Sequence, residues 1–290
     1  MIPGQFDYVR PGNLDETLRI LKDREGEAKI LSGGYSLIPL LKLRLAQPGL
    51  LVDIQAVAGL DGIVRTDDDW RIGSRATHRS ILEHAGLTAE HALIGDAASG
   101  IGDPQVRNWG TIGGSVAHAD PASDWPAVLL ALRASVVVRS LDGERVLPAR
   151  GFFLDTFQTG IEPTEVLTEI RIPHAAPRTG SAYEKLERRA GDFATVGVAA
   201  VLTLAADGSI AAAGVALTAV NDAPFAATDA EAALLGARPD NDAFATAAGA
   251  AAAQSKPVSD SHGPADYKLA MVREITARAL RQAAARAHGA

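Results

Sequence analysis

Two glycine pairs, each flanked by hydroxyl side chains, constrain this chain more than any other feature of its sequence. The first, Ser32-Gly33-Gly34-Tyr35-Ser36, follows a predicted strand at 28–31 and precedes a predicted helix at 36–45. The second, Thr111-Ile112-Gly113-Gly114-Ser115, repeats the theme. Glycine has no Cβ, so its backbone can approach a phosphate closely and present N–H groups to it. The sequence therefore predicts anion-binding turns, with the Ser36 hydroxyl facing the first anion.

The alternative interpretation is that each glycine pair is only a tight turn, since Gly-Gly is a common turn dipeptide. The two pairs together, with their hydroxyls, favour a ligand with two phosphate groups, such as a dinucleotide. Two common phosphate-binding sequences are missing: there is no G-x-x-x-x-G-K-[ST], and no G-x-G-x-x-G follows a strand. We therefore expect a dinucleotide site that is neither a P-loop nor a Rossmann site.

The composition is that of a folded protein without cysteine. The 290 residues are 47% apolar and 22% charged, enough for a sizeable core, and the length corresponds to roughly two domains. The net charge of −7 disfavours nucleic acid as the main partner. Without cysteine, the sequence cannot form disulfides, thiolate zinc sites or cysteine-ligated iron–sulfur clusters.

The sequence shows no targeting or membrane segment. Residues 1–7 lack a basic region followed by an apolar run, so no signal peptide is visible. Gly, Asp or Arg interrupts every apolar stretch well before the ~20 residues needed to span a bilayer. We therefore expect a cytoplasmic protein without a transmembrane segment.

Local signals predict the remaining elements. Asn13 followed by Glu16 is typical of a capped helix start, and this helix should run to about residue 22. The leucine-rich stretch 37–45 is expected to pack in the core. Asp142-Gly143 and Asp207-Gly208 predict hairpin turns. Further strands are expected at 50–54, 70–74, 136–139, 166–172, 183–186, 196–204 and 210–217, and further helices at 77–85, 89–98, 121–132, 228–235, 242–253 and 264–286.

Both glycine motifs, with the residues that follow them, carry a resemblance to a known family. Ser32 to Ser36 continues as Leu37-Ile38-Pro39-Leu40-Leu41-Lys42-Leu43-Arg44, and Thr111 to Ser115 continues as Val116-Ala117-His118-Ala119-Asp120-Pro121. These sequences resemble the two flavin motifs of the FAD-binding medium subunits of molybdenum hydroxylases, the aerobic carbon monoxide dehydrogenase and xanthine dehydrogenase family. The resemblance covers nearly the whole chain, including Lys185-Leu186-Glu187-Arg188-Arg189.

The resemblance implies an α+β fold in two domains. Residues 1–175 would form a two-subdomain FAD-binding domain of the PCMH, or vanillyl-alcohol-oxidase-like, type, with subdomains at about 1–55 and 56–175. Residues 176–290 would form a smaller C-terminal domain with a three-stranded antiparallel sheet and a helical bundle. The prolines and glycine of the segment 173–180 mark the same boundary.

The resemblance also implies the residues that bind FAD. The two motifs would hold the diphosphate, together with Leu31, Leu37 and Ala117 beside them. Ile101 matches a position that packs on the flavin nucleotide, Asp124 one that binds the ribose and nearby groups, and Lys185 one near the flavin ring. Phe193 stands where carbon monoxide dehydrogenase has a tyrosine, and Tyr35 replaces the more usual His or Gln. At Phe193 the aromatic face would remain while the hydroxyl contact is lost.

Simpler interpretations stay open for several of these residues. Asp124 could be a charge that complements a helix N-terminus, Lys185 a solvated strand residue, and Phe193 plain core. His118, Asp120 and Asp124 could be metal ligands, but their spacing is loose, and we expect no metal site. We also expect no catalytic residue, because no histidine lies near a Gly-x-Ser-x-Gly turn.

The function that the resemblance implies is electron transfer through non-covalently bound FAD. The molybdenum cofactor and [2Fe-2S] clusters would lie on a large and a small partner subunit, and the assembly would be a dimer of heterotrimers. The lack of cysteine agrees with clusters on another chain. Two alternatives stay open: a self-sufficient FAD-dependent oxidoreductase acting on a small molecule, and a nucleotide-binding module without redox activity.

Overall fold

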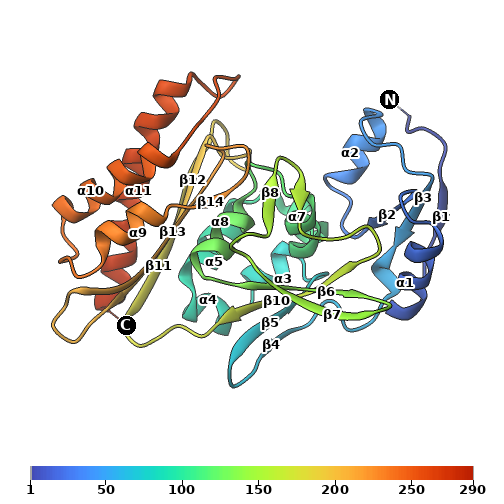
Figure 1. Cartoon of the computed structure of the whole chain (residues 1–290), viewed down its shortest axis with the longest axis horizontal. Coiled ribbons are helices and arrows are strands. Elements are labelled where there is room, and N and C mark those ends of the chain that lie inside the picture. Colours follow the sequence, from blue (N-terminus) through green and yellow to red (C-terminus); the bar gives the residue numbers. More distant parts are fainter. Residues whose placement is uncertain (1, 290) are drawn as a thin grey trace.

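The N-terminal part of the chain is a small parallel sheet with two helices. The structure is a computed structural model that describes residues 2–289. Strands β1 (Asp7–Val9), β2 (Ala28–Leu31) and β3 (Leu50–Asp53) pair in the order β1-β3-β2, with α1 (Leu14–Asp23), α2 (Leu37–Lys42) and the 3-10 turn η1 (Ile54–Ala56). Asn13 caps α1 by accepting from the Glu16 amide at 2.9 Å, as the capping pattern predicts. This part lies at one end of the molecule, in blue in Figure 1.

Helix α2 differs from the prediction in both length and burial. It ends at Lys42, and Arg44 has a left-handed backbone with φ of 58°. Such a backbone cannot continue an α-helix. Only Leu41 of the leucine-rich stretch has a buried side chain, whereas Leu43 and Leu45 are 51% and 73% exposed. The expectation that 37–45 packs in the core is therefore wrong for most of the stretch.

The middle of the chain is a five-stranded antiparallel sheet covered by short helices. The strand order is β4-β5-β10-β6-β7, and the predicted hairpin at Asp142-Gly143 joins β6 to β7. The strands are β4 (Ile63–Arg65), β5 (Asp69–Gly73), β6 (Ser135–Ser140), β7 (Gly143–Pro148) and β10 (Val166–Pro173), with a small hairpin of β8 (Phe153–Asp155) and β9 (Gln158–Thr159). The helices are α3 (His78–Leu82), α4 (Ala85–Glu90), α5 (Ala92–Gly100), α6 (Pro104–Trp109), α7 (Ile112–His118) and α8 (Asp124–Ala131).

The predicted helices 77–85 and 89–98 are three helices in the structure. Thr77 caps α3, and the His84 imidazole caps α4 by accepting from the Leu87 amide at 3.2 Å. His84 and His91 both leave the helical region of backbone angles, so they separate α3 from α4 and α4 from α5. The sequence pattern alone did not show these breaks, because histidine is an uncommon N-cap.

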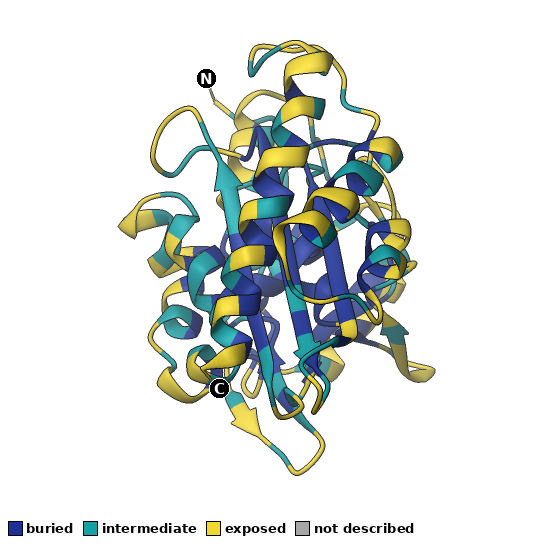
Figure 2. Ribbon diagram, turned by 90° about the vertical axis from the view of Figure 1, so that its left-hand side faces the viewer, coloured by how far each residue is buried: buried dark blue, intermediate teal, exposed yellow. Residues whose placement is uncertain are grey.

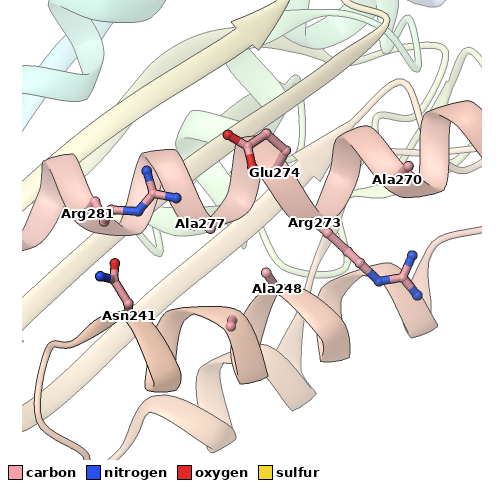
Figure 3. Close-up of a pocket in the computed structure, with 8 residues that line it drawn as sticks. Asn241, Ala248, Ala270, Arg273, Glu274, Ala277 and Arg281 are labelled. Carbon is pink, nitrogen blue, oxygen red and sulfur yellow. The ribbon is translucent and has the colours of Figure 1, made fainter.

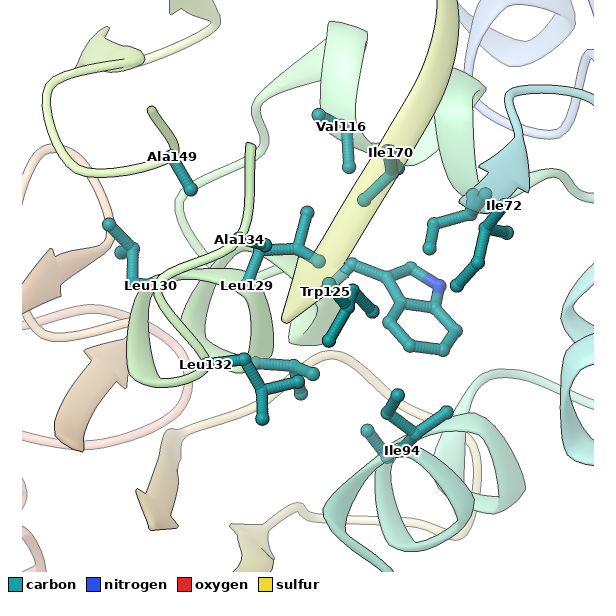
Figure 4. Packing of buried hydrophobic residues seen from close by; sticks show 14 of the residues in the cluster. Ile72, Ile94, Val116, Trp125, Leu129, Leu130, Leu132, Ala134, Ala149 and Ile170 are labelled. Carbon is teal, nitrogen blue, oxygen red and sulfur yellow. The ribbon is translucent and has the colours of Figure 1, made fainter. Parts of the chain in front are cut away.

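Helix α8 is the centre of the main hydrophobic core. Each of its residues is buried, and the Trp125 side chain is only 1% exposed. Figure 4 shows Trp125 between Ile94 of α5 and Ile72 and Ile170 of the sheet. The helix therefore joins the five-stranded sheet to the rest of the molecule.

The C-terminal part is an antiparallel sheet with helices on its outer face. The strands β11 (Thr179–Leu186), β12 (Val196–Leu204), β13 (Ile210–Thr218) and β14 (Phe225–Ala226) pair in chain order, and α9 (Thr228–Leu234), α10 (Asn241–Gln254) and α11 (Ala265–His288) follow. Figure 2 faces these helices, whose outer residues are exposed while the strands behind them are buried. The expected sheet of three strands has a fourth, because the two residues of β14 turn back to pair with Ala216 and Leu217.

Two glycines allow helices to approach this C-terminal sheet from both sides. A Cβ at Gly180 would lie 2.1 Å from the Ala283 carbonyl oxygen of α11, and one at Gly214 would lie 2.2 Å from the Ala131 carbonyl oxygen of α8. The sheet is therefore packed between α11 and α8 (Figure 1). Within residues 2–289, no helix combines the length and apolarity needed to cross a membrane.

Candidate functional site

The two glycine motifs lie against each other. The Ser32 and Thr111 hydroxyls are 3.0 Å apart, although 79 residues separate them in sequence. A Cβ at Gly33 would lie 2.5 Å from the Trp109 carbonyl oxygen and 2.9 Å from the Gly110 Cα. Real Cβ atoms do not approach backbone atoms this closely, so only glycine at position 33 permits the contact.

The first motif presents unpaired backbone amides. The segment Ser32–Ser36 lies between β2 and α2, and Gly34 has φ of 86°. None of the backbone N–H groups of residues 32–36 donates a hydrogen bond to any residue in the range 2–289. Gly33 is buried and its neighbours are half-buried, apart from exposed Tyr35. Because partly buried amides without acceptors are uncommon, this segment fits an anion that would accept from them.

The second motif is not a turn, and this corrects the expectation of two equivalent amide cradles. Residues 112–115 form the first turn of α7, and their amides already have acceptors within the protein. The Ile112 and Gly113 amides donate to the Ala76 and Ser74 carbonyl oxygens at 3.0 and 2.9 Å. The Gly114 amide donates to Thr111 Oγ1 at 3.1 Å, and the Ser115 amide to the Thr111 carbonyl oxygen.

Close packing explains the glycines of the second motif. A Cβ at Gly113 would lie 2.5 Å from the Ser74 Cβ and carbonyl oxygen, and one at Gly114 would lie 2.9 Å from Thr111 Oγ1. Gly113 lets α7 lie against Ser74, just after β5, and Gly114 leaves room for the Thr111 hydroxyl that caps the helix. The second motif therefore supplies hydroxyls and a packing surface at residues 110–115, whereas the first motif supplies the free amides.

His78 packs against residues 110–115 from the protein interior. Burial lowers the pKa of the His78 imidazole to about 4, so the ring is neutral. Its Nδ1 accepts from the Trp125 indole at 3.0 Å, and a Cβ at Gly110 would lie 2.8 Å from its Nε2. The segment before Thr111 is thus held against a neutral, buried ring.

Asp124 and Lys185 form a second group of predicted residues. Lys185 Nζ lies 3.3 Å from Asp124 Oδ2, and it also donates to the Gly100 carbonyl oxygen at 3.0 Å. Burial raises the pKa of the Asp124 carboxyl, and the Lys185 ammonium opposes this shift. With side chains 8% and 7% exposed, Lys185 and Asp124 are a buried pair, so Lys185 is not a solvated strand residue.

Ile101 follows the residue that Lys185 contacts, and the loop that carries Phe193 contacts the next residue, Gly102. Ile101 follows Gly100 at the end of α5, and Gly191 packs so closely on Gly102 that a Cβ would lie 2.6 Å from the Gly102 carbonyl oxygen. The Phe193 ring is 51% exposed, so the interpretation of Phe193 as plain core is wrong. The loop 187–194, which carries this exposed aromatic ring, therefore contacts the chain just after α5 through Gly191.

One hydrogen bond connects the glycine motifs to the Asp124–Lys185 pair. Ser115 Oγ of α7 lies 2.7 Å from Ser123 Oγ, next to Asp124. Ala117 is exposed on the same helix, while Leu31 and Leu37 are half-buried at either end of the first motif. The contacts of Ser32 with Thr111, of Ser115 with Ser123 and of Asp124 with Lys185 thus form a connected path from the end of β2 through α7 to β11.

Two further residues next to this region, Tyr183 and Gly197, lie outside the motifs that the sequence indicated. Tyr183 is a buried tyrosine that donates to Asp124 Oδ1 at 2.6 Å, and its hydroxyl lies over Gly197 of the neighbouring strand β12. The available signals were a tyrosine two residues before Lys185 and a glycine in the interior of a strand.

Neither a metal site nor the groove between α10 and α11 offers an alternative to this region. Among residues 2–289 there is no group of three His, Asp or Glu side chains that could hold a metal ion. His118 packs instead on the Phe157 ring, with ring centroids 4.9 Å apart. Figure 3 shows a shallow groove of about 680 Å³ between α10 and α11, lined by residues such as Arg273 and Arg281. This groove lies on the outer helices and not beside the glycine motifs.

Comparison with known proteins places the chain in a family. Residues 4–175 match the family described as "FAD binding domain in molybdopterin dehydrogenase", and residues 181–283 match "CO dehydrogenase flavoprotein C-terminal domain". The chain belongs to the FAD-binding medium subunits of molybdenum hydroxylases. This family membership identifies it as an oxidoreductase subunit with FAD as its cofactor, as the resemblance implies.

Relatives of this flavoprotein are subunits of enzymes that are named for different substrates. It is 41% identical to the carbon monoxide dehydrogenase medium chain of Hydrogenophaga pseudoflava, over 99% of both chains. It is 37% identical to the alpha subunit of the 6-hydroxypseudooxynicotine dehydrogenase complex of Paenarthrobacter nicotinovorans, over 99% of this chain and 97% of the relative. These relatives therefore share the flavoprotein architecture, whereas the enzymes to which they belong are named for different substrates.

Solved structures agree with this architecture. The flavoprotein superposes on a chain of carbon monoxide dehydrogenase from Hydrogenophaga pseudoflava with a TM-score of 0.96 at 43% identity, covering 99% of both chains. It superposes on a chain of quinoline 2-oxidoreductase from Pseudomonas putida 86 with a TM-score of 0.93 at 33% identity, covering 99% of both chains. The α+β fold expected from the resemblance is confirmed.

Proposed function

We propose that this chain accepts electrons from an iron–sulfur subunit of a molybdenum hydroxylase and delivers them from FAD to an external acceptor. When bound, FAD supplies the chemistry of collecting electrons singly and passing them on. The protein's task is to bind the cofactor, orient it and limit access of water. The observation that carries the proposal is the contact between the two glycine motifs, 79 residues apart, beside a segment of unpaired amides.

The residues that we propose to hold FAD fall into two groups. The amides of 32–36 would donate hydrogen bonds to the diphosphate oxygens, with the hydroxyls of Thr111 and Ser115 alongside. Ile101, Lys185 and Phe193 would lie at the flavin ring, and the buried Asp124 would fix Lys185. In this arrangement no side chain forms a covalent bond to FAD.

We further propose the assembly and its location. A large molybdenum-cofactor subunit and a small iron–sulfur subunit would join the chain in a dimer of heterotrimers in the cytoplasm. Within the chain, we propose a division into a FAD-binding domain at 1–175 and a C-terminal domain at 176–290, supported by the separate sheets on either side of 174–178. Light scattering on the co-expressed subunits measures the stoichiometry.

Electron transfer from the small subunit tests the proposed function directly. Small subunit reduced with dithionite and then desalted is mixed anaerobically with the FAD-loaded chain, and the visible flavin absorption is followed. We expect rapid bleaching, and no bleaching with air-oxidised small subunit as the control. Bleaching by carbon monoxide, nicotine or quinoline without any partner would instead support a self-sufficient oxidoreductase. A chain that stays colourless with FAD would contradict both.

A further inference from the structure

Tyr183 is a buried phenol fixed at both of its ends. Its hydroxyl donates to Asp124 Oδ1 at 2.6 Å, and its backbone amide donates to Asp96 Oδ2 at 3.1 Å. Asp96 is itself held by Arg286, with guanidinium–carboxylate distances of 2.6 and 3.0 Å. Burial, and then the nearby Asp124 carboxylate, raises the pKa of the Tyr183 phenol well above its usual value. The phenol therefore stays protonated and acts as a hydrogen-bond donor.

The neighbouring strand leaves room for this phenol. Gly197 of β12 pairs with Lys185 of β11, and a Cβ at Gly197 would lie 2.3 Å from the Tyr183 hydroxyl oxygen. Glycine in the interior of a strand costs stability and often marks a close approach. Here the missing side chain is the space that the hydroxyl occupies.

Asp124 divides its two oxygens between Tyr183 and Lys185. Oδ1 accepts from the phenol, while Oδ2 accepts from Lys185 Nζ at 3.3 Å. Lys185 Nζ also lies 3.2 Å from Glu187 Oε2, so two carboxylates compete for one ammonium group. The charged groups around Asp124 are therefore Lys185 and Glu187, with the Asp96–Arg286 pair behind Tyr183.

We propose that Tyr183 is a positioning residue of the flavin site. Its hydroxyl keeps Asp124 ionised, and ionised Asp124 holds Lys185 against the Gly100 carbonyl oxygen, beside Ile101. Without the hydroxyl, the buried Asp124 carboxylate loses a donor and takes up a proton more readily. Neutral Asp124 no longer attracts the ammonium group, and Lys185 moves toward Glu187. The inference rests on the proposed function, and it does not require Tyr183 to touch FAD.

The test is the pH dependence of FAD affinity in Tyr183→Phe, which removes only the hydroxyl. FAD binding is measured by quenching of flavin fluorescence between about pH 6 and pH 8. We expect flat affinity for the wild type. In Tyr183→Phe, affinity should fall about ten-fold as the pH is lowered and approach the wild-type value as the pH is raised, because a buried Asp124 that has lost a donor takes up a proton more readily. The matched control is Tyr267→Phe, at an exposed position on α11.

Asp124→Asn separates positioning from plain structural support. This variant has no titrating group at position 124, so its weaker affinity should not vary with pH. Adding Tyr183→Phe to it should introduce no pH dependence. Wild-type affinity in Tyr183→Phe at every pH overturns the inference, and so does an equal loss at every pH, which marks a structural role. Failure of the wild type to bind FAD would overturn the proposed function instead.

A second measurement remains if Tyr183→Phe does not fold. Wild-type protein is prepared with 3-fluorotyrosine, which preserves the size of the side chain, and fluorine NMR is recorded with and without FAD. The resonance assigned to Tyr183 should shift when FAD binds, because a ligand beside Lys185 changes the electric field at the Tyr183–Asp124 hydrogen bond, while that of Tyr267 should not. A Tyr183 resonance that FAD leaves unchanged would overturn the inference.

Discussion

Ser32 Oγ of the first glycine motif lies 3.0 Å from Thr111 Oγ1 of the second, and Thr111 Oγ1 also accepts from the Gly114 amide at 3.1 Å. One hydroxyl thus caps α7 and ties the two motifs together. The amides of the second motif are already paired within the protein. The second motif nevertheless contributes to the site, because Thr111 contacts the first motif, which has the free amides.

Thr111→Val should therefore weaken both the fold and cofactor binding. The variant keeps the shape of the side chain but removes the cap and the contact to Ser32. We expect the free energy of unfolding to fall by about 1 kcal/mol and FAD affinity to fall several-fold. Urea denaturation and fluorescence quenching measure the two effects. Thr246→Val, at an exposed position in α10, is the control and should change neither.

Gly33→Ala should separate the two motifs. The new methyl group would overlap the Trp109 carbonyl oxygen, at 2.5 Å. Because the neighbour is backbone, the loop itself must move, and we expect a loss of about 1–3 kcal/mol in the free energy of unfolding with FAD binding reduced ten-fold or more. Gly62→Ala is the control, since a Cβ there meets nothing within 4 Å. Equal FAD affinity in the two variants would contradict the assigned role of Gly33.

His78 should make stability depend on pH in the mildly acidic range. Its pKa is about 4 in the folded protein and about 6.5 when unfolded. Between these values the unfolded chain binds a proton that the folded chain does not, so stability is full above pH 6.5 and falls as the pH drops toward 4. Between about pH 7 and pH 5, the wild type should lose about 2 kcal/mol more than His78→Gln. Urea midpoints at the two pH values measure the difference, and identical losses would show that His78 is not buried as a neutral ring.

Arg286→Met should loosen the C-terminal helix from the FAD-binding part. Arg286 makes two bonds to Asp96 and donates to the Ser181 carbonyl oxygen at 2.6 Å. Its loss leaves a partly buried carboxylate without its cation, which should cost about 2–3 kcal/mol of unfolding free energy. Arg278→Met on the same helix removes only an exposed pair with Glu274 and should cost less than about 0.5 kcal/mol. Similar costs for the two variants would contradict the structural role of Arg286.

The elements with strong local signals could be predicted from the sequence. The strand at 28–31, the capped start of α1 and the hairpins at Asp142-Gly143 and Asp207-Gly208 are confirmed, because turn glycines and side-chain caps act within a few residues. The predicted final helix, 264–286, agrees closely with α11. Helix ends at His84 and Arg44 could not be predicted, since neither residue is a usual cap.

The site could be predicted less fully than the fold. Glycine pairs next to hydroxyls indicated the two motifs, but a sequence cannot show whether glycine serves a ligand or a neighbouring backbone. In Gly113 it serves the backbone of Ser74. Tyr183 was missed because a tyrosine in a predicted strand looks like core until its hydroxyl is seen beside Asp124.

Hydrogen exchange with and without FAD tests the central claim most directly. The amides of 32–36 have no acceptor in the described protein, whereas those of 112–115 are already bonded. FAD should therefore strongly slow exchange at 32–36 and leave 112–115 nearly unchanged. FAD that binds without protecting 32–36 would contradict the account.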